Sequence, residues 1–211
     1  MHKIVLLILI SFLSSHALSL NQVRADLQKA TTPRDSAEIK IRTTITAPSV
    51  KQEVSVYIVQ KGPSKKYMEI KNSFMNQRTI VNEGRMKVVN LNTQESQVLP
   101  YNGESLKALS YAKFNPLDSG EWSEPKFVTE NTYSIAGEKG VAYYDSAKKR
   151  IEKFEQVDGE KSVLTTFQYN GDGKIKSMNT SVVTNGVETS VTTEFLVLRS
   201  STKFPDKAFN F

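Results

Sequence analysis

The sequence predicts a mainly β protein: a strongly curved antiparallel sheet, or incomplete β-barrel, covered by an N-terminal helix and a short inserted helix. Apolar residues recur at every second position through most of the chain, which is typical of half-buried strands. Turn sequences rich in Gly, Asn, Asp or Pro interrupt these runs at regular spacing. A long meander has two exposed edges, so it must curl, close or be covered.

The chain has 211 residues, no cysteine and two histidines. This length is ample for one sizeable core. The absence of cysteine excludes disulfides, thiolate metal sites and cysteine nucleophiles. The histidines, His2 and His16, both lie near the start of the chain, so their fate depends on that segment.

The N-terminal segment has the order of a secretory signal peptide. Lys3 precedes an apolar run over residues 4–13, and small residues follow at the positions that a signal peptidase requires. We expect cleavage after Ala17 or Ser19. A short membrane anchor is the alternative, but the apolar run is shorter than the roughly twenty residues needed to span a bilayer.

Cleavage at either site removes both histidines, and we expect residues 20–211 to form a single domain without histidine or cysteine. This excludes imidazole general-base catalysis and His or Cys metal sites. The sequence therefore predicts no catalytic residue, no metal and no cofactor. A hydrolase that uses serine or carboxylates remains an alternative, although Glu83, Asp145, Asp158 and Asp172 lie beside turns, where carboxylates usually bond to the local backbone.

The charge balance is modestly basic. The formal net charge is +6, and removal of Lys3 with the signal peptide lowers it to +5. Such a charge favours anionic membrane surfaces or acidic partners, or simply a solvated basic surface. The basic and aromatic residues form no nucleic-acid-binding motif, so we expect no nucleic-acid partner.

The first predicted element is a helix. Leu20, Val23 and Leu27 recur at three- and four-residue spacing. Ser19 with Gln22 can cap its start, and Pro33 stops it. So short a helix must bury its apolar stripe against something else to be stable.

The period then changes to two, and three strands follow, separated by turns at residues 48–49 and 62–63. Their apolar positions are Ile39, Ile41 and Ile45, then Val54, Val56 and Ile58, then Met68 and Ile70. A hairpin over residues 79–90 adds Met86 and Val88. Residues 103–120 break the pattern, and Leu106 and Leu109 predict a short helix near 104–112 followed by a loop to Trp122.

The meander resumes with strands near 133–135, 141–144, 151–157 and 163–169. The clearest hairpin joins residues 180–184 to residues 187–197 through Asn185-Gly186, because a type I′ turn needs positive φ at both of its central positions. The whole chain is expected to form about ten strands.

Three stretches resemble the periplasmic outer-membrane lipoprotein carriers, the LolA-like family. They are Ile58–Pro63 with Lys66–Ile70, Thr79–Asn90 with the strand and turn after it, and Phe204–Phe211. The resemblance implies an open β-barrel lidded by helices that holds acyl chains and ferries lipoproteins across the periplasm. It implies a monomer with an inner-membrane donor and an outer-membrane acceptor, and no enzyme activity. The chain differs in having Gly62 where the family has an arginine before the turn proline.

These considerations predict an apolar cavity for acyl chains of lipoproteins or another lipid. Its predicted lining is Leu20, Val23, Leu27, Ile39, Ile41, Ile45, Val54, Val56, Ile58, Met68, Ile70, Met86, Val88, Leu106 and Leu109. An ordinary sheet core, with the helix packed permanently on it, is the structural alternative. The functional alternative is a sensor or structural module of the same fold that binds a protein partner in the cell envelope.

Overall fold

The computed structural model describes residues 18–31, 36–102, 116–118, 120–138, 140–200 and 202–211. The predicted signal peptide and the predicted inserted helix near 104–112 lie outside these residues. No helix within the described ranges is long and apolar enough to cross a membrane.

The protein is built on one antiparallel sheet of thirteen strands, three more than the approximate number expected from the sequence. The strands are β1 Ser36–Ala47, β2 Val50–Lys61, β3 Lys65–Lys71, β4 Asn76–Asn82, β5 Arg85–Asn90, β6 Ser96–Pro100, β7 Lys126–Thr129, β8 Thr132–Gly137, β9 Gly140–Asp145, β10 Arg150–Asp158, β11 Lys161–Tyr169, β12 Ile175–Thr184 and β13 Val187–Arg199. Strand β7 was not predicted, because all four of its residues are exposed and it therefore has no alternation of buried and exposed positions.

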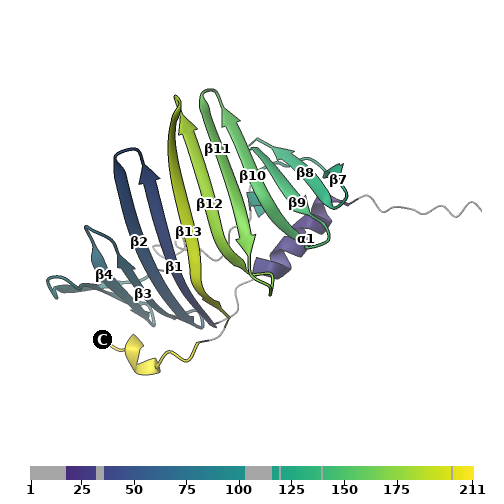
Figure 1. Ribbon diagram of the computed structural model, residues 1–211. Coiled ribbons are helices and arrows are strands. Elements are labelled where there is room, and N and C mark those ends of the chain that lie inside the picture. Colours follow the sequence, from purple (N-terminus) through teal and green to yellow (C-terminus); the bar gives the residue numbers. More distant parts are fainter. Residues whose placement is uncertain (1–17, 32–35, 103–115, 119, 139, 201) are drawn as a thin grey trace, which may run out of the picture.

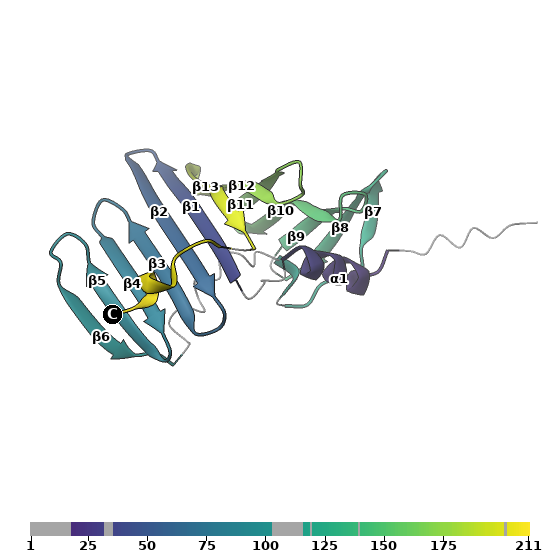
Figure 2. The same ribbon diagram turned by 90° about the horizontal axis from the view of Figure 1, so that it is seen from below.

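The strand order is β6-β5-β4-β3-β2-β1-β13-β12-β11-β10-β9-β8-β7. The first strand therefore pairs with the last, and the two edge strands come from the middle of the chain. Figures 1 and 2 show a strongly curved sheet that does not close. The expected mainly β fold with a curved antiparallel sheet is thus confirmed.

The hairpin between β12 and β13 has the expected geometry. Thr184 pairs with Val187, and the two residues between them have positive φ, 51° at Asn185 and 75° at Gly186. Asparagine and glycine tolerate this conformation better than other residues. The local sequence therefore sets this turn.

Helix α1, Leu20–Thr31, lies against the β8–β12 part of the sheet (Figure 2). The Ser19 hydroxyl accepts a hydrogen bond from the Gln22 backbone N–H at 3.2 Å, as expected of a cap. The Leu20 N–H donates to the Glu124 carboxylate at 2.8 Å, which ties the same end of the helix to the segment before β7. The start of the helix is thus held from two sides.

The apolar stripe of α1 closes a packed core. Leu20, Val23 and Leu27 pack with Leu117 and with sheet residues of the same cluster, which are Ile135, Ala142, Tyr144, Ile151 and Phe167. In addition, the Tyr144 hydroxyl donates to the Asp26 carboxylate at 3.0 Å, and both side chains are buried. The helix therefore has apolar and polar anchors on this part of the sheet.

The segment after Leu117 is less irregular than expected. Pro116–Asp118 forms a short 3₁₀ helix, and Trp122 makes an isolated bridge with Gly137. A Cβ atom at Gly137 would lie 2.6 Å from the Trp122 ring, so only glycine allows this close approach. The loop expected here thus contains one 3₁₀ turn and one isolated bridge, and the bridge depends on a contact that is not local.

Residues 202–211, here called the C-terminal segment, cross the other face of the sheet. Phe204 and Phe209 pack against Val59, Tyr67 and Ile80 of β2, β3 and β4. These strand positions alternate with Ile58 and Met68, which belong to a cluster on the opposite side. We call the face that carries α1 the concave face and the face that carries the C-terminal segment the outer face.

Candidate functional site: an apolar cavity on the concave face

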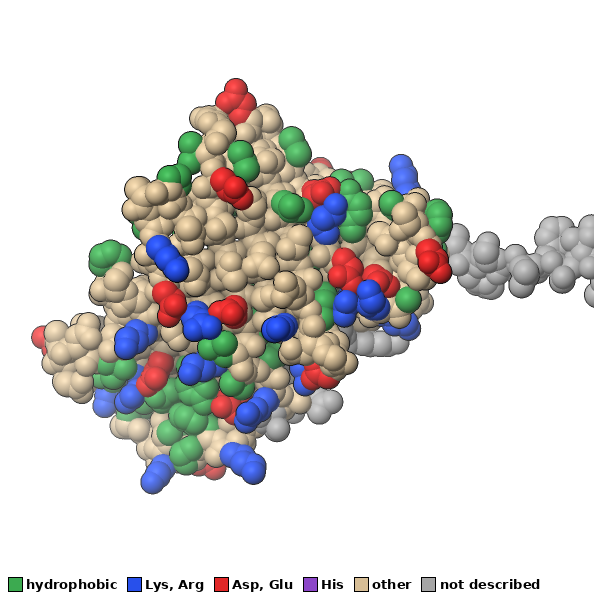
Figure 3. All heavy atoms as spheres, in the orientation of Figure 1, with side chains coloured by type: hydrophobic (Ala, Val, Ile, Leu, Met, Phe, Trp, Pro, Cys, Tyr) green, Lys and Arg blue, Asp and Glu red, His purple; other side chains and the backbone are tan. Residues whose placement is uncertain are grey.

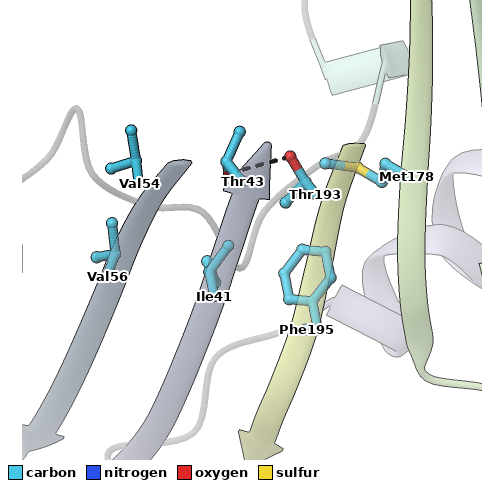
Figure 4. A pocket seen from close by; sticks show the side chains of 7 residues that line it. All are labelled: Ile41, Thr43, Val54, Val56, Met178, Thr193 and Phe195. Carbon is cyan, nitrogen blue, oxygen red and sulfur yellow. Dashed lines mark hydrogen bonds between the residues drawn. The ribbon is translucent and has the colours of Figure 1, made fainter. Parts of the chain in front are cut away.

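Four adjacent strands, β2, β1, β13 and β12, build a cavity of about 350 Å³ on the concave face (Figure 4). Its lining is Ile41, Thr43, Val54, Val56, Met178, Thr193 and Phe195. The strand register explains the grouping: Ile41 lies opposite both Val56 and Phe195, Thr43 lies opposite both Val54 and Thr193, and Thr193 lies opposite Met178. Directly paired side chains share a face, so these seven must meet.

A bulge contributes to this arrangement. The register between β1 and β13 shifts between Lys40 and Ile41. As a result Phe195 and Leu198, three positions apart, pack against the same cluster on the concave face. A regular strand would send residues three apart to opposite faces.

The cavity lining carries no titratable side chain. Five of its seven residues are apolar, and the two threonines hydrogen-bond to each other at 3.2 Å between their hydroxyl oxygens. One hydroxyl donates to the other, which leaves the second hydroxyl hydrogen free to meet a ligand oxygen. The site therefore suits an apolar chain with one weakly polar contact.

Packed apolar clusters border the cavity on both sides. On the β2–β3 side, Ile39 and Met68 are buried and Ile58 and Ile70 pack against them. On the other side, Met178 contacts the α1 cluster as well as the cavity. The cavity thus lies beside α1, between the two clusters.

The structure brings only part of the predicted lining to the cavity. Ile41, Val54 and Val56 line it, and the adjoining cluster contains Ile39, Ile58, Met68 and Ile70. Leu20, Val23 and Leu27 instead form the packed core with the β8–β12 part of the sheet. Ile45, Met86 and Val88 are half-buried on the concave face, and Leu106 and Leu109 lie outside the described residues.

Four lining residues were missed: Thr43, Met178, Thr193 and Phe195. Thr43 alternates with Ile41 and Ile45, so its position on this face was visible in the sequence. The other three lie on β12 and β13, which reach the cavity only because β13 pairs with β1. The sequence carries no local signal for that pairing.

The carboxylates that could suggest catalysis have structural partners. Asp145 accepts hydrogen bonds from the backbone N–H groups of Ala147 and Lys148, and Asp172 accepts one from Lys174. Within the described residues, no group of three His, Cys, Asp or Glu side chains is placed to hold a metal ion. The turn interpretation is therefore confirmed for Asp145 and Asp172.

Two tyrosines whose pKa values are raised lie on the outer face, away from the cavity lining. Burial, with a hydrogen bond to Glu38, raises the pKa of Tyr57 to about 12. Burial, with a hydrogen bond to Glu69, raises the pKa of Tyr67 to about 12. Both rings belong to the outer-face cluster under the C-terminal segment, so these shifts reflect structural packing.

Comparison with solved structures places this architecture among known proteins. A LolA superfamily protein from Nitrosomonas europaea matches with a TM-score of 0.54 and 13% identity, over 90% of this chain and 97% of its own. A putative outer membrane lipoprotein-sorting protein domain from Vibrio parahaemolyticus matches with a TM-score of 0.50 and 10% identity. The match covers 90% of this chain and 95% of that domain. No protein-family model matches the sequence, and no curated protein matches it.

At these identities the likeness concerns the fold, and it covers most of the chain in both cases. This chain therefore has the fold of the LolA superfamily.

Proposed function

We propose that this protein binds acyl chains in the concave cavity and carries lipoproteins or lipids through the cell envelope to the outer membrane. The observation that supports it most directly is the cavity itself, whose lining is apolar apart from one threonine pair. The likeness to a lipoprotein-sorting domain supports the same class of ligand. The signal-peptide pattern of residues 1–17 supports export to the periplasm.

The energetics of such binding are adequate. Burial of one methylene is worth about 0.8 kcal/mol, so a chain of about ten methylenes gains roughly 8 kcal/mol before the costs of association. Those costs amount to several kcal/mol, which leaves a net affinity weak enough for release. A carrier needs that balance, because it must give up its cargo.

Filling the cavity tests the binding step. The substitution Val54→Trp places an indole among the lining residues and should weaken binding of a fluorescent fatty acid at least about tenfold. Leu164→Trp is the matched control, because Leu164 is an exposed strand residue that does not line the cavity. Circular dichroism and thermal unfolding should show that both variants fold.

Equal binding by both variants, or no binding of the fatty acid by the unchanged protein, would contradict the proposal. The ligand class can be checked directly by native mass spectrometry of protein recovered from cell envelopes, where a bound lipid or acylated peptide is expected. The delivery step requires a transfer assay: protein loaded with an acylated peptide should pass it to acceptor vesicles, and Val54→Trp should reduce the amount transferred.

The alternative, a module that binds a protein partner, makes a different prediction. Its complex should persist when Met68 and Ile70 are replaced by charged residues, because both side chains belong to the concave-face cluster that adjoins the cavity. A carrier should lose lipid binding in that variant. Co-purification and fatty-acid binding measured on the same sample therefore separate the two functions.

A further inference from the structure

A second surface lies on the outer face, beside the C-terminal segment. In the strand register, Lys61 pairs with Lys65, Lys65 with Asn82, and Asn82 with Arg85. Paired residues share a face, so Lys61, Lys65 and Arg85 form a row across β2, β3 and β5. The row lies on the outer face, because Lys65 is two positions from Tyr67 of the outer-face cluster.

The C-terminal segment lies along this row and adds further cations. Lys61 binds Asp206 at 3.1 Å, and this bond, together with the charge of Lys65, lowers the pKa of Asp206. Arg85 stacks over the Phe211 ring at 5.6 Å. Lys203 and Lys207 on the segment are exposed. We call Lys65, Arg85, Lys203 and Lys207 the basic patch.

The basic patch is short of carboxylates. None of its four residues makes an ion pair within the described part of the chain. Of the nearby carboxylates, Asp206 and Glu38 are engaged by Lys61 and Arg199, and Glu83 lies exposed in the turn before Arg85. Around β9 and β10 the opposite holds, since Lys148, Arg150 and Lys153 each bind a neighbouring carboxylate. Four cations without an ion pair among the described residues thus gather around the C-terminal segment.

Apolar groups lie among these cations. Phe211 is 38% exposed and Pro205 is exposed. Figure 3 shows a hydrophobic patch at the lower left, where Figure 1 places β2, β3 and the C-terminal segment, with many Lys and Arg and a few Asp and Glu side chains around it. Cations around exposed apolar groups are typical of proteins that rest on an anionic lipid surface.

We propose that the basic patch docks the protein on anionic phospholipid headgroups. The lysines are long point charges that reach separate phosphates, and the aromatic and proline side chains lie at the boundary with the acyl region. Each cation close to an anionic surface contributes about 1 kcal/mol, so four give weak, reversible and salt-dependent attachment. This inference goes beyond the proposed function, and it does not depend on what fills the cavity.

The test is co-sedimentation with vesicles that contain phosphatidylglycerol and with vesicles of phosphatidylcholine alone. The unchanged protein should bind the anionic vesicles and not the neutral ones. High salt should release it, because the Debye length falls from about 10 Å at 0.1 M to about 3 Å at 1 M. In the patch variant, Lys65, Arg85 and Lys207 are all replaced by Glu. Its partition coefficient onto anionic vesicles should be at least about tenfold lower than that of the unchanged protein.

The matched control is Lys126→Glu, Lys161→Glu, Lys176→Glu. These three lysines are exposed, make no ion pair within the described residues, and lie on β7, β11 and β12, away from the basic patch. The control changes the net charge by the same amount and should keep most of the binding. Equal loss in both variants, unchanged binding by the patch variant, or equal binding of the protein to neutral vesicles would each overturn the proposal.

Failure of this inference can be told from failure of the proposed function. The patch variant should still bind the fluorescent fatty acid, because none of its substitutions lines the cavity. Val54→Trp should still bind anionic vesicles. A patch variant that lost fatty-acid binding as well would be misfolded, and circular dichroism would detect this. In that case the single substitution Lys207→Glu, at an exposed position, tests the basic patch in a folded protein.

Discussion

The two ends of the sheet use their concave faces differently. In the β8–β12 part, α1 packs on the apolar face, and Val23, Ile135, Ala142 and Tyr144 are fully buried. In the part around β1, the same face lines a cavity, and the apolar segment packed here, residues 202–211, lies on the outer face. In one half the covering element thus packs on the concave face, and in the other half it packs on the outer face.

The difference teaches that an apolar strand face does not by itself indicate a ligand site. Both halves show the same alternation of residues along their strands. What separates them is the element that packs on each face. The largest effects on stability should therefore come from the α1 half, and the largest effects on ligand binding from the cavity half.

Matched phenylalanine truncations give the largest expected contrast. Phe167→Ala removes a ring buried in the α1 cluster and should lower the free energy of unfolding by about 3–5 kcal/mol. Phe195→Ala removes a half-buried ring that borders the cavity and should cost only about 1–2 kcal/mol, because fewer contacts are lost. Urea unfolding measures both. Equal costs would show that the cavity half is packed as tightly as the α1 half.

The buried hydrogen bond beneath α1 gives the next largest effect. Tyr144→Phe leaves the Asp26 carboxylate short of one donor in a buried site and should cost about 1.5–3 kcal/mol. Tyr143→Phe removes a similar bond, to Glu155 at 2.8 Å, at a half-buried position and should cost less than about 1 kcal/mol. Thermal unfolding of the two variants measures both costs. Equal losses of stability in Tyr144→Phe and Tyr143→Phe would contradict a special role of the bond between Tyr144 and Asp26.

The threonine pair in the cavity should affect ligand preference more than stability. Thr43→Val with Thr193→Val removes both hydroxyls together and keeps the shape, so the change in stability should be below about 1 kcal/mol. Affinity for a fully apolar chain should stay or rise, whereas affinity for a ligand with an oxygen at that point should fall. A titration with an alkane-like probe and with a fatty acid would separate these outcomes, and equal changes for both probes would count against a polar contact.

The turn between β9 and β10 should give the smallest effect, and one that depends on pH. Burial alone would raise the pKa of Asp145, but the side chain and backbone of Lys148 and the backbone of Ala147 bind the carboxylate and lower it. A carboxylate with a lowered pKa in the folded state stabilises the fold above its unfolded pKa of about 3.9, and this contribution is lost as pH falls through the folded value. The melting temperature of Asp145→Asn should therefore fall less between about pH 5 and about pH 2 than that of the unchanged protein.

The elements that could be predicted from the sequence are those that depend on residues close together in the chain. The stripe of Leu20, Val23 and Leu27, the cap at Ser19 and the turn at Asn185-Gly186 all depend on residues within a few positions of one another. The cavity was recovered only in part, as Ile41, Val54 and Val56 on two strands joined by a short turn. The sequence did not show that α1 packs on the β8–β12 part of the sheet instead of lining the cavity, because its packing partners, from Leu117 onward, lie far away in the chain.

The sequence by itself determined the β-rich class, the helix at the start, most hairpins and the alternation of apolar residues along the predicted strands, because these follow from the period of side chains and from turn chemistry. Only the tertiary structure decided that β1 pairs with β13, that the bulge near Ile41 brings Phe195 to the cavity, and that the C-terminal segment covers the outer face. Those contacts join residues far apart in the chain. Their free energy comes from packing and burial that no short window of sequence contains.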